Sequence, residues 1–193
     1  MTLILASTSP IRRSMLEAAG LAFEAMAPGV DEGSLKSDGD AADALATRLA
    51  AAKALAVSGQ RPDAWTIGSD SVVTVGGRRF DKPRDRDQAA EHLRLFSGRT
   101  MILTSAVALA RNGEVDWSAA ESARLEVRDL SDRFIETYLE AEWPEVGYCV
   151  GVFRLEGRGV QLFSAIEGSH STILGMPLLP LLGALRDRGL IMS

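Results

Sequence analysis

The segment from Leu3 to Leu16, LILASTSPIRRSML, constrains the fold of this chain more than any other stretch. The short apolar run that opens it predicts a buried strand. Serine and threonine residues and then Pro10 follow, and this combination starts helices, because a hydroxyl caps free backbone N–H groups and proline tolerates the first turn. The chain is therefore expected to begin with a buried strand that passes at once into a capped helix.

This helix start also carries the groups of an anion site. It combines unpaired backbone N–H donors with the hydroxyl of Ser7 and the guanidinium groups of Arg12 and Arg13. Phosphate is the commonest anion bound at such a place. An ordinary capped helix with solvated arginines gives the same pattern, so the segment alone leaves both interpretations open.

Composition limits what the chain can be. Its 193 residues are 46% hydrophobic and 24% charged, which is typical of a soluble globular protein and long enough for one well-filled domain over residues 1–193. The net charge of −5 offers no basic face to a nucleic acid polymer. A single cysteine, Cys149, fits a reducing compartment, and the longest apolar stretch, residues 173–185, is too short to span a bilayer. We expect a cytoplasmic protein without a signal peptide.

Helical and strand patterns alternate along the chain. Helices are predicted over residues 11–19, 41–57, 86–96, 131–141 and 177–186, and strands over residues 22–27, 65–75, 99–110, 119–128 and 160–166. Gly76-Gly77 and Asn112-Gly113 are typical of hairpin turns. This order indicates an α/β protein with a mixed, twisted sheet and flanking helices.

Asp70 is the most unusual polar residue, because it interrupts an apolar strand within the step Gly68-Ser69-Asp70-Ser71. A carboxylate at the end of a buried strand is costly unless it is paired, binds a metal or acts as a base, although a turn or capping role is the simpler explanation. Glu32 in a polar loop, Lys53 on an alanine-rich helix and Lys82 beside Pro83 could likewise be ordinary solvated side chains.

Taken together, these residues favour a phosphate substrate. Ser7, Arg12, Arg13, Lys53 and Lys82 suit phosphate, whereas Glu32 and Asp70 are hard oxygen ligands suited to Mg²⁺ or Mn²⁺. Two histidines and one cysteine make a zinc site improbable, and no G-x-S-x-G, G-x-G-x-x-G or Walker motif is present. A phosphate substrate handled by carboxylates and a divalent metal is the sharpest hypothesis.

The whole chain resembles the Maf family of nucleoside triphosphate pyrophosphatases. The resemblance rests on segments that occur in order, namely LASTSPIRRSML, VDE, RLAAAKA, IGSDSVV, FDKPRDRDQAAEHLRLFSGRT, GVFRLEGRGVQLFSAIEGS and ILGMPLLPLL. It implies a mixed α/β fold of two lobes with a central cleft, as in Maf and ITPase proteins, and a homodimer. It also implies metal-dependent hydrolysis of a nucleoside triphosphate to the monophosphate and pyrophosphate.

The resemblance assigns roles to residues. It implies that Asp70 is the proton acceptor, and that the segment from Ser7 to Arg13, with Glu32, Lys53 and Lys82, forms the rest of the site. Arg12, Ser71 and Glu156 are the positions expected to govern base specificity.

Some positions depart from the common family pattern. Ile11 replaces the first arginine, Glu145-Val146-Gly147 replaces a lysine-containing stretch, and Ser71 matches neither branch of the family. In this resemblance Glu156 matches the branch similar to 7-methyl-GTP pyrophosphatases, whereas pyrimidine-directed members carry glutamine. A carboxylate also suits guanine, because it accepts hydrogen bonds from the N–H groups of that base. The base preference therefore leans toward 7-methyl-GTP.

Three hypotheses of function follow. The first is a pyrophosphatase that clears modified nucleotides, and the second is a nucleotide-binding regulator of cell division or septum formation with little turnover. The third is an α/β domain whose polar residues are only caps and solvated faces. An intact set of Asp70, Glu32, Lys53 and Lys82 favours the enzyme, because a pure binder needs no base.

Overall fold

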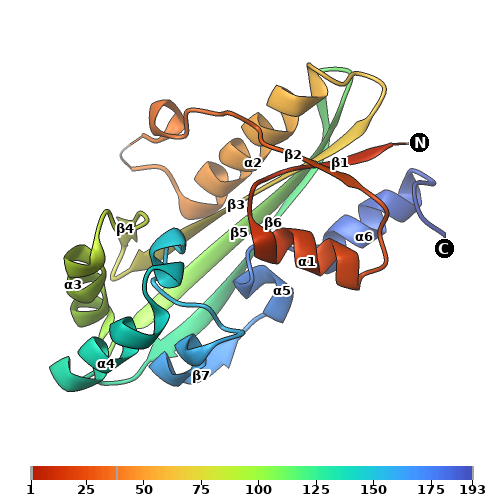
Figure 1. Ribbon diagram of the computed structural model, residues 1–193. Coiled ribbons are helices and arrows are strands. Elements are labelled where there is room, and N and C mark those ends of the chain that lie inside the picture. Colours follow the sequence, from red (N-terminus) through yellow and green to blue (C-terminus); the bar gives the residue numbers. More distant parts are fainter. Residues whose placement is uncertain (1, 38, 193) are drawn as a thin grey trace. The chain divides into compact units, whose positions relative to one another are not determined.

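The computed structural model describes residues 2–37 and 39–192, and Figure 1 traces the chain. The strands are β1 (Leu3–Ala6), β2 (Glu24–Met26), β3 (Trp65–Val75), β4 (Arg78–Phe80), β5 (Thr100–Arg111), β6 (Glu114–Val127) and β7 (Phe163–Glu167). The α-helices are α1 (Pro10–Ala18), α2 (Ala42–Ser58), α3 (Arg86–Phe96), α4 (Asp132–Glu142), α5 (His170–Ile173) and α6 (Leu178–Asp187). Short 3-10 helices are η1 (Gly33–Leu35), η2 (Glu145–Tyr148) and η3 (Arg158–Leu162).

All seven strands join one sheet. The strand order is β2-β1-β3-β5-β6-β7, and β4 pairs with β3. β1 is parallel to both β2 and β3, whereas β3–β4 and β6–β7 are antiparallel. The predicted mixed α/β fold with flanking helices is confirmed.

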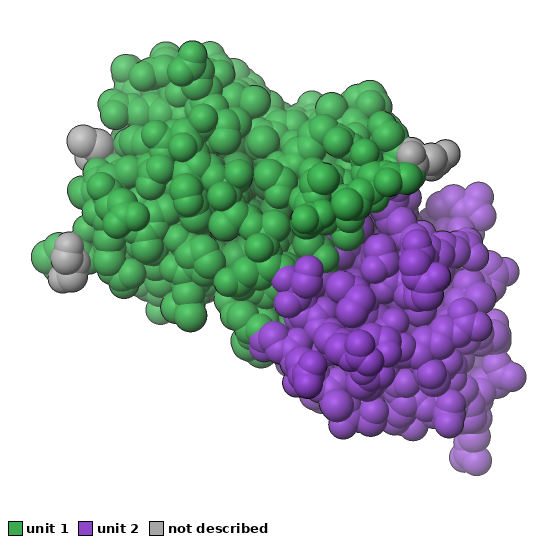
Figure 2. Space-filling model, turned by 180° about the vertical axis from the view of Figure 1, so that it is seen from behind, with its two compact units in different colours: residues 1–71, 104–121, 169–193 green, residues 72–103, 122–168 purple. Residues whose placement is uncertain are grey.

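The chain divides into two compact units, coloured separately in Figure 2. Unit 1 consists of residues 1–71, 104–121 and 169–193, and unit 2 of residues 72–103 and 122–168. Two units agree with the two lobes expected from the sequence. The expected cleft and the single-domain assignment over residues 1–193 stay predictions.

In unit 1 the alternation of side chains along β1 separates two layers of core. Leu3 and Leu5 join a cluster with residues of α1 and α6, while Ile4 and Ala6 pack with Val57 of α2. Since successive side chains of a strand point to opposite faces, α1 and α6 cover one face of this part of the sheet and α2 covers the other.

Unit 2 has an aromatic core of its own. Phe80 of β4 packs edge-on against His92 and Phe96 of α3, and Phe153 packs edge-on against Phe163 at the start of β7. Helices α3 and α4 are in contact with each other. These contacts bury aromatic side chains within unit 2 itself.

The structure corrects three details of the predicted elements. The step from Gly68 to Ser71 is no break, because β3 runs through it. The strand predicted to begin at residue 119 begins at Glu114, since positive φ angles at Asn112 and Gly113 make a tight turn that pairs the strands at once. Residues 160–162 belong to η3 instead of a strand. Gly159 packs directly against the backbone of Arg154 in this 3-10 helix. A Cβ atom at position 159 would lie 2.4 Å from the carbonyl oxygen of Arg154.

Within the part of the chain that the structure describes, no helix combines the length and the apolar character needed to cross a membrane.

Candidate active site

The candidate site lies in unit 1, where β3 continues beyond its parallel partner β1. The register of the two strands ends at Ala6 opposite Gly68, and pairing of β3 with β4 begins at Val73. The residues between these two pairings include Ser69, Asp70 and Ser71. Ligands of open α/β sheets bind at the carboxyl ends of parallel strands, so this position favours a ligand site.

Gly68 explains how α2 reaches the site. A Cβ atom at this position would lie 2.1 Å from the carbonyl oxygen of Ala50 and 2.6 Å from the backbone nitrogen of Ala54. Only glycine therefore allows the helix to lie directly against β3. Lys53, between these two helix residues, comes within reach of Asp70, which points to the same face of the strand as Gly68.

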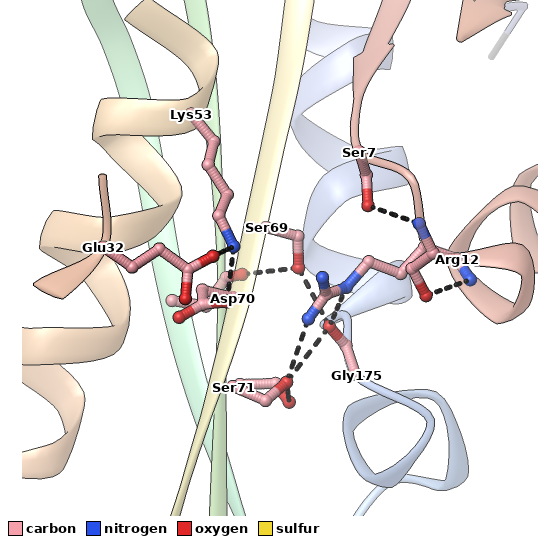
Figure 3. Close-up of polar contacts among 11 residues, drawn as sticks. Ser7, Arg12, Glu32, Lys53, Ser69, Asp70, Ser71 and Gly175 are labelled. Atoms are coloured by element: carbon pink, nitrogen blue, oxygen red, sulfur yellow. Dashed lines mark hydrogen bonds and ion pairs between the residues drawn. The ribbon is translucent and has the colours of Figure 1, made fainter. Parts of the chain in front are cut away.

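Lys53 joins two carboxylates. Its Nζ donates to Oδ1 of Asp70 at 2.7 Å and lies 2.7 Å from Oε1 of Glu32, which precedes η1 (Figure 3). The side chains of Lys53 and Asp70 are 9% and 12% exposed, whereas that of Glu32 is 38% exposed. A buried ammonium between two carboxylates fixes both of them, because leaving any one charge unpaired there would be costly.

The opposite face of β3 meets α1. The predicted cap is confirmed, since the hydroxyl of Ser9 accepts from the backbone N–H of Arg12 and Pro10 occupies the first turn. Arg12 extends back toward the strand, where its Nε donates to the Gly175 carbonyl at 2.9 Å and its Nη2 donates to Oγ of Ser71 at 3.2 Å (Figure 3).

Burial lowers the pKa of Arg12 from its ordinary value, and the nearby charges of Asp70 and Glu32 oppose that effect by raising it. A guanidinium stays protonated in proteins even so. The site in unit 1 therefore places one guanidinium and one ammonium within electrostatic reach of the same two carboxylates.

The other two residues of the first segment differ in their surroundings. The hydroxyl of Ser7 accepts from the backbone N–H of Ser9 at 3.1 Å and shapes the turn into α1. Arg13 points along the exposed side of that helix and pairs with Glu17 at 2.8 Å. The structure thus brings Arg12, Lys53, Glu32, Asp70 and Ser71 together, and it places Arg13 in a surface ion pair.

Two of the expected site residues, Lys82 and Glu156, belong to unit 2 and are exposed there. Both lie within electrostatic range of Cys149. Burial and the charge of Glu156 raise the pKa of that thiol and Lys82 opposes them, with the net result that the pKa is about 11. Their roles in a common site with Asp70 stay predictions.

The loop that carries Glu156 is firmly held inside unit 2. Val152 has a φ of 56°, which is strained for a β-branched residue, and its carbonyl accepts from the Tyr138 hydroxyl at 3.0 Å. Arg154 donates to the buried carboxylate of Glu142 through Nε at 3.2 Å and Nη2 at 2.9 Å. These contacts fix the backbone two residues before Glu156.

Sequence reasoning missed the hydroxyl and carbonyl groups behind Arg12. The Ser69 hydroxyl shares its one proton between the carbonyl oxygens of Ala106 and Gly175, at 2.8 and 2.9 Å, and the Ser105 hydroxyl lies 2.7 Å from the Ser71 hydroxyl. Gly175 has a φ of 110°, a conformation that glycine adopts without strain. Nothing in the spacing of these residues indicates their proximity, although Gly175 lies in the resembling segment ILGMPLLPLL.

The donor set suits a hard divalent cation. Glu32 and Asp70 supply carboxylate oxygens, and Mg²⁺ is commonly held by one or two carboxylates together with substrate phosphates. Across residues 2–37 and 39–192, no group of three or more His, Cys, Asp and Glu side chains could hold a metal by itself.

Fold and site define a class: an α/β protein whose acidic and basic side chains meet at the carboxyl ends of parallel strands, an arrangement suited to polyphosphate chemistry. The chain belongs to the Maf-like protein family, whose sequence profile matches residues 2–188.

Curated relatives carry enzyme names. The chain is 49% identical over 193 residues to a 7-methyl-GTP pyrophosphatase of Rhizobium meliloti, covering 98% of this chain and 97% of the relative. It is 47% identical over 191 residues to a nucleoside triphosphate pyrophosphatase of Nitrobacter hamburgensis, covering 98% and 95%. A solved nucleoside-triphosphatase (dITP/XTP pyrophosphatase) of Mycobacterium abscessus is more distant, with a TM-score of 0.41 and 16% identity over 67% of this chain and 76% of that chain.

Proposed function

We propose that this chain hydrolyses a nucleoside triphosphate to the monophosphate and pyrophosphate. The observation that carries the proposal is the buried Asp70 carboxylate, fixed by Lys53 beside Arg12 at the carboxyl ends of parallel strands. Relatives nearly half identical over almost their whole length bear the names of such enzymes, which supports the same reaction here.

Asp70 acts as the general base. A water molecule gives a proton to its carboxylate and attacks the α-phosphorus, and the bond from that phosphorus to the oxygen bridging the α- and β-phosphates breaks. Pyrophosphate leaves with the electron pair of that bond. Lys53 holds Asp70 in one orientation, which lets the carboxylate meet the water without reorganising.

Arg12 is the main phosphate ligand of unit 1. Its Nε and Nη2 are held by protein acceptors, so the guanidinium plane is fixed before a ligand arrives. Ser7, Arg13, Lys53 and Lys82 assist in binding the triphosphate. Arg13 would leave its surface pair with Glu17 to do so, and a surface ion pair of this kind costs little to break.

Glu32 and Asp70 would hold a divalent cation, Mg²⁺ or Mn²⁺. Such a cation supplies positive charge to the phosphate oxygens when it is bound. In this proposal Glu32→Gln weakens the dependence of turnover on metal concentration more than it weakens nucleotide binding measured without metal.

The proposed substrate class is nucleotides with a modified guanine base, 7-methyl-GTP among them, read by Glu156 together with Arg12 and Ser71. Support comes from the carboxylate at position 156 and from a relative named for 7-methyl-GTP. Removal of such nucleotides from the pool is the cellular role that this chemistry favours.

The deciding experiment measures pyrophosphate release from a panel that includes 7-methyl-GTP, GTP, dTTP, UTP and CTP with Mg²⁺ or Mn²⁺. We expect turnover in the wild-type protein and a loss of about 10²–10⁴-fold in Asp70→Asn, the usual contribution of one general base. Nucleotide affinity should change far less, and Lys53 keeps Glu32 as an ion-pair partner, which limits the fall in the unfolding midpoint.

Glu24→Gln is the matched control, because Glu24 also pairs with a cation in unit 1, Arg61 at 3.0 Å, but on the surface. Full turnover in Asp70→Asn would remove Asp70 from the role of base. Tight nucleotide binding without pyrophosphate release from any substrate would instead support the regulator of cell division.

A further inference from the structure

A chain of hydrogen bonds runs from Arg12 into the interior of unit 1. Nη2 of Arg12 donates to Oγ of Ser71 at 3.2 Å, and that oxygen lies 2.7 Å from Oγ of Ser105. Ser105 in turn donates to the Thr172 carbonyl at 2.7 Å. Ser105 and Thr172 are fully buried, so water does not compete for these groups.

The direction of this chain follows from counting protons. Each serine hydroxyl has one proton to donate, and a carbonyl can only accept. The hydroxyl proton of Ser105 is used in the hydrogen bond to the Thr172 carbonyl. In the 2.7 Å contact between the two serines, Ser71 is therefore the donor and Ser105 the acceptor. The opposite direction leaves Ser105 no proton for Thr172 and gives Ser71 only a 3.4 Å contact with the Gly175 carbonyl.

The hydrogen-bond chain is anchored at Thr172, its end farthest from Arg12. The hydroxyl of Thr172 donates to the Glu121 carboxylate at 2.6 Å, and the carbonyl of Thr172 also accepts from the backbone N–H of Gly175 at 3.1 Å. Gly175 itself accepts from Nε of Arg12. Both contacts of the Arg12 guanidinium therefore lead to the same short segment, residues 172–175.

We propose that Ser105 is a positioning residue for Arg12, acting through Ser71. By accepting the hydrogen bond that the Ser71 hydroxyl donates, Ser105 turns the lone pairs of Ser71 toward the guanidinium, so that Ser71 acts toward Arg12 only as an acceptor. Arg12 then meets a polyphosphate in a single orientation. The inference rests on the proposed function for the nature of the ligand, although the hydrogen-bond chain exists without it.

Ser105→Ala tests this role. Without its acceptor, the Ser71 hydroxyl is free to turn toward the Gly175 carbonyl, where it competes with Nε of Arg12. We expect a rise of about two- to tenfold in KM for the best nucleotide and in the dissociation constant of inorganic tripolyphosphate measured by calorimetry, the range of one neutral hydrogen bond. The value of kcat should change less, because Asp70 and Lys53 are untouched.

A double-mutant cycle with Ser71→Ala separates positioning from general damage. If Ser105 acts through Ser71, adding Ser105→Ala to Ser71→Ala causes no further rise in KM. Ser58→Ala is the matched control, since Ser58 is a fully buried serine of unit 1 that accepts from the Gly113 N–H at 3.0 Å. It should lower stability without changing KM.

An unchanged KM in folded Ser105→Ala, or additive effects in the cycle, would overturn the inference. Should that variant not fold, Ser105→Cys keeps the size of the side chain with a weaker donor and acceptor, and the same increase in KM is expected. Tripolyphosphate binding that weakens in Ser105→Ala, in a protein that releases no pyrophosphate, would overturn the proposed function and leave the positioning role supported.

Discussion

In the proposed function, the side chain at position 156 selects the base. A carboxylate offers only hydrogen-bond acceptors, whereas the Watson–Crick edge of uracil or thymine presents one N–H flanked by two carbonyl oxygens. Guanine presents two neighbouring N–H donors. Glu156 is exposed, and the contacts of Val152 and Arg154 hold the loop that carries it. Its carboxylate is therefore accessible to a base.

We therefore expect Glu156→Gln to raise the ratio of kcat/KM for UTP or dTTP over that for 7-methyl-GTP by about tenfold, the effect of one charged hydrogen bond. The ratio is measured by pyrophosphate release from each nucleotide. Glu145→Gln, another exposed carboxylate of unit 2, serves as the control. A preference of the wild-type protein for dTTP and UTP would contradict this assignment.

His92 makes the stability of the protein depend on pH. It is buried against Phe80 and Phe96, and among the described residues its Nδ1 has no hydrogen-bond partner. Burial lowers the pKa of His92 and Arg78 lowers it further, while Glu91 and Asp81 oppose the shift. Below the ordinary histidine pKa of about 6.5 the unfolded chain binds this proton more readily than the folded one.

The free energy of unfolding should therefore fall as the pH drops from 7 to 5, and part of that slope should vanish in His92→Leu. Urea denaturation at a series of pH values measures this dependence of the free energy of unfolding on pH. His170→Leu replaces the other histidine of the chain, an exposed one, and should keep the wild-type slope. Equal slopes in all three proteins would refute the role of His92.

At the scale of elements, the contact between α2 and β3 decides whether the site forms. Gly68→Ala places a methyl group 2.1 Å from the Ala50 carbonyl oxygen, so helix and strand must separate. We expect a loss of about 1–3 kcal/mol in the free energy of unfolding, as for other overpacked cores, together with a fall in turnover because Lys53 moves away from Asp70.

Gly183→Ala on α6 is the matched control. No atom lies within 4 Å of a Cβ at this position, and replacing a helical glycine by alanine usually stabilises a helix by about 0.5–1 kcal/mol. Denaturation and pyrophosphate release are measured on both variants. Wild-type stability and turnover in Gly68→Ala would contradict the packing argument.

At the scale of the whole molecule, strands β3, β5 and β6 each contribute residues to both units. We expect the two units to unfold in one cooperative transition, as a single domain would. In Trp143→Phe the remaining tryptophans, Trp65 and Trp117, belong to unit 1, so fluorescence reports that unit while circular dichroism reports both. Different midpoints from the two probes would indicate two independent domains.

The homodimer implied by the family resemblance also belongs to this scale. Light scattering should give twice the chain mass of 20.6 kDa.

The sequence alone determined the local structure of this protein. The serine and proline residues before α1 specify its start, since a cap depends only on residues three or four positions apart. Apolar periodicity likewise predicted α3 and β3 with the bounds that the structure has. The ordered family segments singled out Asp70, Lys53 and Glu32, and the structure brings these three side chains together.

Only the tertiary structure decided which polar groups meet. Lys53 and Glu32 are 21 positions apart and Arg12 and Gly175 are 163 apart, separations that no local pattern encodes. Strand β3 continues through Asp70 because Gly68 allows close packing against α2 and does not form a turn. This use of the glycine depends on the position of α2 in the fold. The sequence did not indicate a role for Ser105 for the same reason. A buried hydroxyl in an apolar strand depends on its hydrogen-bond partner, here Ser71, and the fold determines that partner.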